Sequence, residues 1–278
     1  MKILIIGGTR FVGKYLVNLF ENKKNQLTII SKKKIKIYKK NIRFINLERS
    51  KGIKKIKNEK FDLCFDFIAF NKKAPREIFK NVNLKRYILI STTWIPMFLK
   101  KKANDVCHYN KKVFDKIDAP KITKNYIKGK ILSENEVIKY RNKNFFGIIL
   151  RLPVIFGLED HTKRLDFYFS RMKKKKDIYL IDKGNNFIQF CWYEDIAKAL
   201  KRWSMKPDLE KRIIWEALPK KSIKLKLLIK YLASHFGEKI KLINVYKNKI
   251  SKFEKDYIKH EPFFREKKIN RSVNNIFN

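Results

Sequence analysis

A glycine-rich stretch near the start of the chain has the composition of a phosphate-binding loop. It reads Gly7-Gly8-Thr9-Arg10-Phe11-Val12-Gly13, between a predicted strand at residues 2–6 and a segment with helical spacing at residues 12–22. Gly7 would permit a tight turn, Gly13 would let helix and strand approach closely, and the helix N-terminus would face a pyrophosphate. This position directly after a strand favours a dinucleotide site over a purely structural turn. Arg10 stands where such loops commonly have their middle glycine.

The end of the second predicted strand, residues 26–31, bears on the choice between NAD and NADP. NAD-selective folds usually present Asp or Glu there to hold the ribose 2′-hydroxyl. This chain has Ser31 followed by Lys32, Lys33 and Lys34 instead. Arg10 and Lys32 could together bind a 2′-phosphate, which favours NADP. The alternative is that Lys32 belongs to one more solvated lysine run.

A second pair of residues could perform acid-base chemistry. Tyr126 and Lys130 are four residues apart in a predicted helix at residues 124–140, so both can address the same ligand, and Glu134 follows one turn later. A lysine ammonium beside a phenol favours the phenolate and lowers the phenol pKa from about 10. Tyr126 would then be a usable acid and base near neutral pH. The spacing alone is unspecific in a chain so rich in Lys and Tyr.

Apolar runs alternate with helical segments in the part of the chain that must position these residues. Further strands are predicted at residues 42–47, 61–68, 87–91 and 146–150. This alternation predicts a doubly wound parallel sheet, an α/β fold of the Rossmann type. After Pro153 the pattern is less regular, with a strand at 178–181 and helices at 194–203 and 223–236. We therefore expect an NAD(P)-binding domain at 1–157 and a smaller substrate-binding α/β part at 158–278, with 183–203 returning to the first.

The hydrophobic content and the positions of Cys and His indicate the broad class of protein. The 278 residues are 44% hydrophobic, enough for a large core, yet no run approaches the ~20 apolar residues of a membrane span. The apolar run at residues 3–6 is too short for a signal peptide, which predicts a cytoplasmic protein. The three widely spaced cysteines indicate neither disulfides nor a metal cluster, and we expect them to be buried or without a role. The four histidines show no ligand spacing, so no metal is expected: His108, His161, His235 and His260.

The charge of the chain is unusual. It has 68 Lys and Arg against 26 Asp and Glu, a formal net charge of +42. Such a field attracts polyanions, so RNA, anionic membranes and anionic nucleotides are all admissible partners. Joint over-use of Lys, Asn and Ile is typical of an A/T-biased genome, and runs such as residues 173–176 have the pattern of solvated loops. We favour composition bias, with a nucleic-acid surface as the alternative.

Five segments in a fixed order resemble the short-chain dehydrogenase/reductase superfamily, in its extended branch of NAD-dependent epimerases and dehydratases. Two of them are the glycine loop and the Tyr126/Lys130 pair. The others are Ile90-Ser91-Thr92-Thr93, Leu150-Arg151-Leu152-Pro153-Val154-Ile155-Phe156-Gly157 and Phe190-Cys191-Trp192-Tyr193-Glu194-Asp195-Ile196-Ala197. The resemblance spans nearly the whole chain. Each segment alone is unspecific, but five in the correct order are hard to obtain by chance.

The resemblance implies a hydroxyl/carbonyl redox step on a nucleotide-linked sugar or similar substrate. Tyr126 would exchange the proton of the substrate hydroxyl, Lys130 would hold the nicotinamide ribose, and Thr93 would hydrogen-bond the reacting oxygen. Asn46 and Leu47 fall where the family contacts adenine, with Asp common at the first position. The remaining cofactor contacts would come from Gly7, Thr9, Arg10, Phe11, Val12, Gly13, Ser31, Lys32, Phe67, Ile68, Ala69 and Pro153. Alternatively, Thr93 only caps the strand end, and Arg151 is a structural ion-pair partner.

Departures from the family pattern narrow the reaction. Sugar dehydratases of this family carry an Asp-Glu pair after the active-site threonine, whereas Thr93 is followed here by Trp94 and Ile95. Epimerisation or ketone reduction is therefore favoured over dehydration. Family members often form homodimers through the tyrosine helix, but lysines along this helix, such as Lys128, would weaken that pairing.

A narrower resemblance supports a rival function. The form of the glycine loop, the stretch Lys128-Gly129-Lys130 and the tail at residues 262–268 resemble the atypical branch that contains the chloroplast stem-loop-binding proteins. That subgroup uses the dinucleotide fold to bind RNA, and some members lack the catalytic tyrosine. The presence of Tyr126 favours an enzyme, and the net charge favours an RNA-binding protein. We take the enzyme as the main hypothesis.

Overall fold

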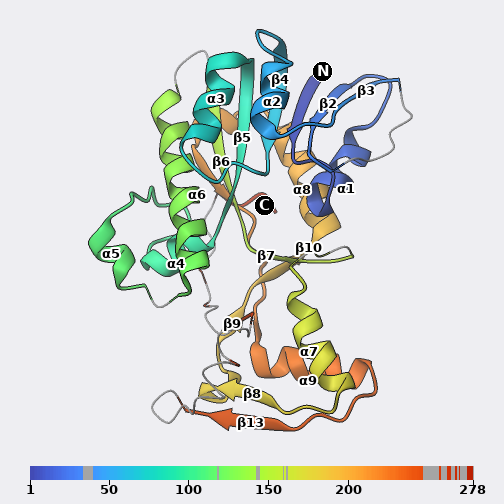
Figure 1. Ribbon diagram of the computed structural model, residues 1–278, viewed down its shortest axis with the longest axis vertical. Helices are drawn as coiled ribbons and strands as arrows, with labels where there is room; N and C mark the ends of the chain where they lie inside the picture. Colours follow the sequence, from blue (N-terminus) through green and yellow to red (C-terminus); the bar gives the residue numbers. More distant parts are fainter. Residues whose placement is uncertain are drawn as a thin grey trace. The chain divides into compact units, whose positions relative to one another are not determined.

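Seven parallel strands form the central sheet of the chain (Figure 1). Their order is β3 (Ile42–Ile45), β2 (Gln26–Ile30), β1 (Lys2–Ile6), β4 (Lys60–Asp66), β5 (Asn83–Thr92), β6 (Phe146–Leu152) and β11 (Ile214–Glu216). The order reverses between β1 and β4, which is the topological switch point of a doubly wound sheet. The predicted Rossmann-type α/β fold is confirmed.

The computed structural model describes most of the chain. The described residues are 1–33, 40–117, 119–141, 145–158, 160, 162–246, 257, 262–263, 267, 269 and 274–277. Lys34, His161, His260 and most of the basic tail at residues 262–268 lie outside them.

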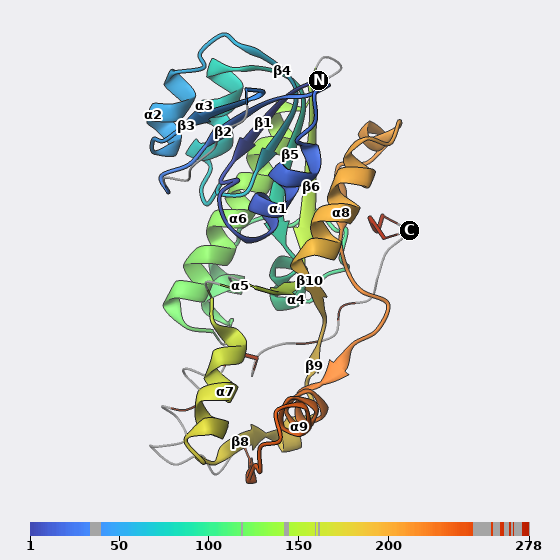
Figure 2. The ribbon, with the colours of Figure 1, turned by 90° about the vertical axis from the view of Figure 1, so that its right-hand side faces the viewer.

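The central strands are apolar because both faces of the sheet are covered. Ile3, Leu4, Ile5 and Ile6 of β1 are fully buried, as expected of a parallel strand between two helical layers. Helices α1 (Phe11–Phe20) and α8 (Tyr193–Ser204) pack on one face. Helices α2 (Arg49–Lys54), α3 (Lys73–Asn81) and α6 (Lys121–Tyr140) cover the other (Figure 2). Because the strands are parallel, their carboxyl ends lie together, and the loops that follow the strands lie at this end of the sheet.

The structure agrees with the predicted elements more closely in type than in bounds. Strand β1 ends where the apolar run ends, whereas α1 ends at Phe20, two residues before the predicted end. Strand β6 continues to Leu152, so Arg151 lies in the sheet. Helix α3 was not predicted: it is polar and contains Pro75, and it is held by Ala74 and Ile78 in the core.

The chain divides into two compact units. One comprises Met1–Glu159, Cys191–Leu218 and Asn270–Asn278, and the other comprises Asp160–Phe190 and Pro219–Ile269. The first unit also contains α4 (Trp94–Leu99), α5 (Lys111–Asp115), β7 (Val154–Phe156), η2 (Leu209–Lys211) and β10 (Phe190–Trp192), which begins at the boundary. The sequence-based division into cofactor and substrate parts concerns function, and it stays a prediction.

The described residues of the second unit form two small sheets, the helices α7 and α9 and one turn of 3-10 helix. Strand β8 (Ile178–Ile181) pairs in parallel with β13 (Leu242–Val245), and β9 (Phe187–Ile188) pairs antiparallel with β12 (Ile223–Lys224). The other elements are α7 (Arg164–Lys173), η1 (Asp182–Gly184) and α9 (Leu225–His235). Among the described helices of the whole chain, none is long and apolar enough to cross a membrane.

Candidate cofactor and active site

The glycine loop joins β1 to α1 by a turn that only small residues permit. Gly7 has a φ of 87°, and a Cβ there would lie 2.8 Å from Cγ2 of Ile68. A Cβ on Gly13 would lie 2.8 Å from the carbonyl oxygen of Gly7. Both glycines are therefore required for the close approach of helix and strand, as the spacing predicts.

The first turn of α1 suits an anion. The Arg10 side chain makes no capping hydrogen bond, and the first turn contains no acidic residue. The positive end of the helix dipole and the first-turn amides would thus favour a phosphate group. Phe11, which opens the helix, has a φ of 51°. A left-handed backbone costs a bulky residue about 1–2 kcal/mol, so this loop stores strain.

Polar residues beside the glycine loop contact one another. The Thr9 hydroxyl lies 2.6 Å from the Ser31 hydroxyl, and both residues are buried. The Asn46 amide donates to the carbonyl oxygens of Ser31 (3.0 Å) and Lys32 (2.9 Å). These contacts fix the ends of β2 and β3 against the loop. The Asn46 side-chain oxygen could still accept a hydrogen bond from an adenine amino group.

Lys32 lies close to a carboxylate, although the lysine run at the end of β2 contains none. Its ammonium lies 2.6 Å from the Glu48 carboxylate, and both side chains are exposed. The hydrogen bond from Lys32 lowers the pKa of Glu48. This pair could not be predicted from the sequence, because Glu48 belongs to the segment after β3. Arg10, by contrast, is exposed, and its side chain has no hydrogen-bond or ion-pair partner among the described residues.

The segment that follows β4 connects the glycine loop with α6. Phe67 and Ile68 contact the Cα side of Gly7, and the Phe67 amide donates to the Ile6 carbonyl oxygen at 3.0 Å. Phe70, three residues after Phe67, lies against α6: a Cβ on Gly129 would lie 2.2 Å from the Phe70 carbonyl oxygen. One short segment therefore packs against both predicted parts of the site. Ala69, between them, is fully buried.

Lys130 is buried beneath an aromatic ring. Its side chain is 2% exposed, Nζ donates to the Ile90 carbonyl oxygen at 2.7 Å, and Nζ lies 4.4 Å from the Phe70 ring centroid. Burial lowers the pKa of Lys130 to about 8, against the attraction of Asp66 and Glu134. The lysine therefore remains mostly charged at neutral pH.

Tyr126 lies on the same helix and contacts two other aromatic rings. Its ring centroid is 6.0 Å from that of Phe70 and 6.0 Å from that of Trp94. Phe70 thus contacts both Tyr126 and Lys130, which brings the predicted pair to one place. Phe70 and Trp94 had not been predicted as site residues; an aromatic residue after a strand is too common a pattern to single out.

Thr93 and Pro153 lie at the same edge of the sheet. The Thr93 hydroxyl donates to the Leu152 carbonyl oxygen at 3.3 Å, and its amide donates to the same oxygen at 3.0 Å. Thr93 is 4% exposed and lies between the end of β5 and the first residue of α4. Pro153 is buried directly after β6. The hydroxyl oxygen of Thr93 keeps its capacity to accept a hydrogen bond.

A buried ion pair supports α6 one turn beyond Lys130. Arg151 donates from Nε and Nη2 to the two carboxylate oxygens of Glu134, at 3.0 and 2.6 Å. Glu134 also accepts from the Ser91 hydroxyl at 2.5 Å. Arg151 Nη1 donates to the carbonyl oxygens of Ala103 and Asp105. The pair links α6, β5, β6 and the segment after α4.

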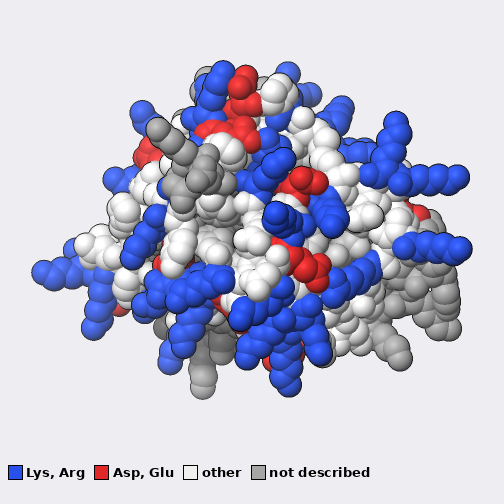
Figure 3. Space-filling view, turned by 90° about the horizontal axis from the view of Figure 1, so that it is seen from above, with Lys and Arg blue, Asp and Glu red and all other residues white. Residues whose placement is uncertain are grey.

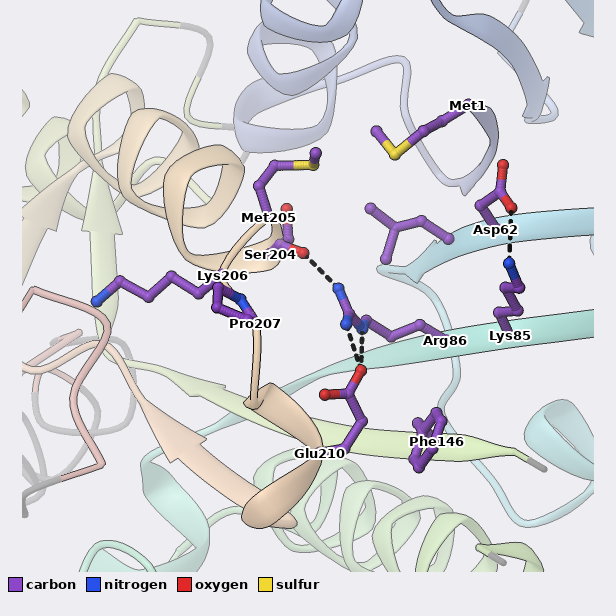
Figure 4. Close-up of a pocket in the computed structure, with 11 residues that line it drawn as sticks. Met1, Asp62, Lys85, Arg86, Phe146, Ser204, Met205, Lys206, Pro207 and Glu210 are labelled. Atoms are coloured by element: carbon purple, nitrogen blue, oxygen red, sulfur yellow. Dashed lines mark hydrogen bonds and ion pairs between the residues drawn. The ribbon is translucent and has the colours of Figure 1, made fainter. Parts of the chain in front are cut away.

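A recess of about 770 Å³ lies at the opposite edge of the sheet (Figure 4). Its lining includes Met1 and the early residues of β4, β5 and β6, so it lies at the amino ends of the strands. Arg86 there donates to the Glu210 carboxylate and to the Ser204 carbonyl oxygen. The predicted cofactor residues do not line this recess.

The sheet order and the glycine loop define a Rossmann-type α/β protein. Residues 3–214 match the model of the NAD dependent epimerase/dehydratase family. The chain belongs to this family, for which NAD binding is typical. No curated protein sequence matches the chain.

Solved structures of epimerases share the fold. The UDP-N-acetylglucosamine 4-epimerase of Methanobrevibacter ruminantium is 17% identical, with a TM-score of 0.63 over 88% of this chain and 85% of its own. The UDP-glucuronic acid 4-epimerase of Bacillus cereus is 14% identical, with a TM-score of 0.63 over 88% and 86%. The UDP-glucose 4-epimerase of Thermotoga maritima is 13% identical, with a TM-score of 0.64 over 98% and 90%. At these identities the likeness concerns the fold.

Proposed function

We propose that the protein is an NAD(P)-dependent epimerase or ketoreductase that acts on a nucleotide-linked sugar. The observation that carries this proposal is the segment after β4, which packs against Gly7 at one end and against Gly129 of the Tyr126/Lys130 helix at the other. The Bacillus cereus enzyme has been crystallised with UDP-glucuronic acid and NAD, which supports a UDP-sugar as the first substrate class to test. Residues 1–157 would bind the cofactor, and the part at 158–278, except for 183–203, would bind the substrate.

The residues of the site would divide the chemistry between them. Tyr126 would take the proton of a substrate hydroxyl and later return it, while Thr93 would hydrogen-bond the reacting oxygen. The charged Lys130 would hold the nicotinamide ribose and stabilise the phenolate of Tyr126. The bound cofactor would supply the acceptor for the hydride released from the carbon that carries the reacting hydroxyl. Trp94 and Ile95 occupy the positions after Thr93, which favours epimerisation or reduction over loss of water.

Thermal unfolding with and without nucleotide tests the cofactor proposal. A ligand at 100 times its Kd stabilises the folded state by about 2.7 kcal/mol, so we expect a Tm increase of several degrees with NAD or NADP. The exposed Arg10 side chain favours a larger increase with NADP, and Lys32 would have to exchange its ion pair with Glu48 for a 2′-phosphate. A panel of UDP-sugars, followed by product analysis, would then identify the reaction. Unchanged Tm values with both nucleotides would contradict the proposal.

We propose RNA binding as a second candidate, because exposed lysines gather away from the cofactor site. Lys and Arg side chains cover much of the face seen in Figure 3. Exposed lysines at the amino ends of the strands, opposite the glycine loop, are Lys2, Lys24, Lys60, Lys85 and Lys206. An anion bound there would not compete with a dinucleotide at the glycine loop.

Titration of a stem-loop RNA at several salt concentrations tests this candidate. We expect affinity to fall steeply with salt and the charge-reversal variant Lys60→Glu/Lys85→Glu to flatten that dependence. NAD should leave the affinity unchanged. Loss of RNA binding on addition of NAD, or no effect of the charge reversal, would argue against a site at this edge.

A further inference from the structure

Phe11 lies in the glycine loop with a backbone conformation that is unfavourable for its side chain. Its φ of 51° is in the left-handed region, which glycine adopts freely and aromatic residues rarely do. Such strain persists only where the surroundings hold it in place. The loop must therefore be held by something outside itself.

The Phe11 ring stacks on Tyr193, the first residue of α8. The ring centroids are 5.3 Å apart and the planes differ by 11°. Tyr15, one turn further along α1, meets the same tyrosine edge-on at 5.7 Å. Aromatic contacts of this kind contribute an energy of the same order as the cost of a left-handed backbone. Tyr193 can therefore offset the strain at Phe11.

Tyr193 has contacts of its own that fix its ring independently of the loop. Gly157 has a φ of 154°, and a Cβ there would lie 2.0 Å from Cδ1 of Tyr193. The backbone after β7 thus lies directly against the ring. The Tyr193 hydroxyl also donates to the Glu194 carboxylate at 3.0 Å. The ring is therefore held by residues outside the glycine loop.

We propose that Tyr193 is a positioning residue for dinucleotide binding: its ring holds Phe11, and so keeps the first-turn amides of α1 directed toward a bound pyrophosphate. This inference rests on the proposed cofactor function. It assigns a binding role to the start of α8, which the Phe190–Ala197 motif had suggested only as a family feature.

Titration of NAD or NADP against a set of variants tests the proposal. We expect Tyr193→Leu to weaken nucleotide binding about 5- to 10-fold, the affinity equivalent of one aromatic contact. Tyr193→Phe keeps the stack and should stay within about two-fold of the parent protein. Tyr15→Leu is the control, because it leaves the Phe11–Tyr193 stack in place and removes the edge contact to the same ring, together with the contact between Tyr15 and Lys198. Its nucleotide affinity should stay within about two-fold of the parent protein.

A double substitution tests whether Tyr193 acts through Phe11. In a Phe11→Gly background both the backbone strain and the ring that stacks on Tyr193 are gone, so adding Tyr193→Leu should change nucleotide affinity by less than about two-fold. If the two substitutions multiply their effects instead, or if folded Tyr193→Leu binds like the parent, the positioning role is wrong.

Hydrogen exchange tests the same proposal without a nucleotide. Amides of residues 8–14 should exchange about ten-fold faster in Tyr193→Leu than in Tyr193→Phe, because local opening becomes easier. Equal exchange would overturn the inference. A parent protein that binds neither nucleotide but shows this difference would instead contradict the proposed cofactor function and leave the loop support intact.

Discussion

Tyr126→Phe should lower turnover by about 10²–10⁴-fold, the usual contribution of a positioned acid-base group. The expected cause is loss of the hydroxyl that exchanges a proton with the substrate. The ring would keep its contacts with Phe70 and Trp94, both at 6.0 Å, so cofactor affinity should stay within about two-fold. The measurement is steady-state turnover of the UDP-sugar found in the panel above, together with nucleotide titration.

Tyr140→Phe is the matched control for this substitution. Tyr140 closes the same helix and packs against Phe79, 5.2 Å between ring centroids, away from the candidate site. Its hydroxyl has no proposed part in the reaction, so turnover should be unchanged. A Tyr126→Phe enzyme that turned over at the parent rate would show that another group carries the proton.

Breaking the buried Glu134–Arg151 pair should lower the free energy of unfolding more than breaking an exposed ion pair. The two side chains are 1% and 0% exposed, and removal of one partner from a buried ion pair costs about 3–5 kcal/mol because a charge is left without compensation. We therefore expect both Glu134→Gln and Arg151→Met to lower the free energy of unfolding in urea by that amount. Arg151→Met would also leave two backbone carbonyls without their donor.

Two comparisons show whether the loss comes from the stranded charge. The double variant Glu134→Leu/Arg151→Met removes both charges and should recover part of the stability. Arg43→Met removes one partner of a pair whose side chains are 49% and 38% exposed, so it should cost no more than about 1 kcal/mol. A single variant at Glu134 as stable as Arg43→Met would mean that water reaches the buried pair.

The fold class followed from local patterns in the sequence. Short apolar runs such as residues 3–6 indicated strands, and their alternation with helical segments implied a parallel sheet. Helix α3 escaped prediction because its stability comes from packing of Ala74 and Ile78 rather than from its own composition. The glycine turn was readable because a left-handed backbone and a close approach restrict residue type at fixed positions.

The sequence by itself thus determined six of the seven strands of the central sheet, the glycine turn and the shared helix face of Tyr126 and Lys130. Only the tertiary structure decided which neighbours these residues have: Phe70 over Lys130, Glu48 beside Lys32, Tyr193 beneath Phe11. The reason is physical. Periodicity and turn chemistry act over a few residues, whereas the partner of a side chain depends on how distant segments pack, and many residue types can fill the same neighbouring position.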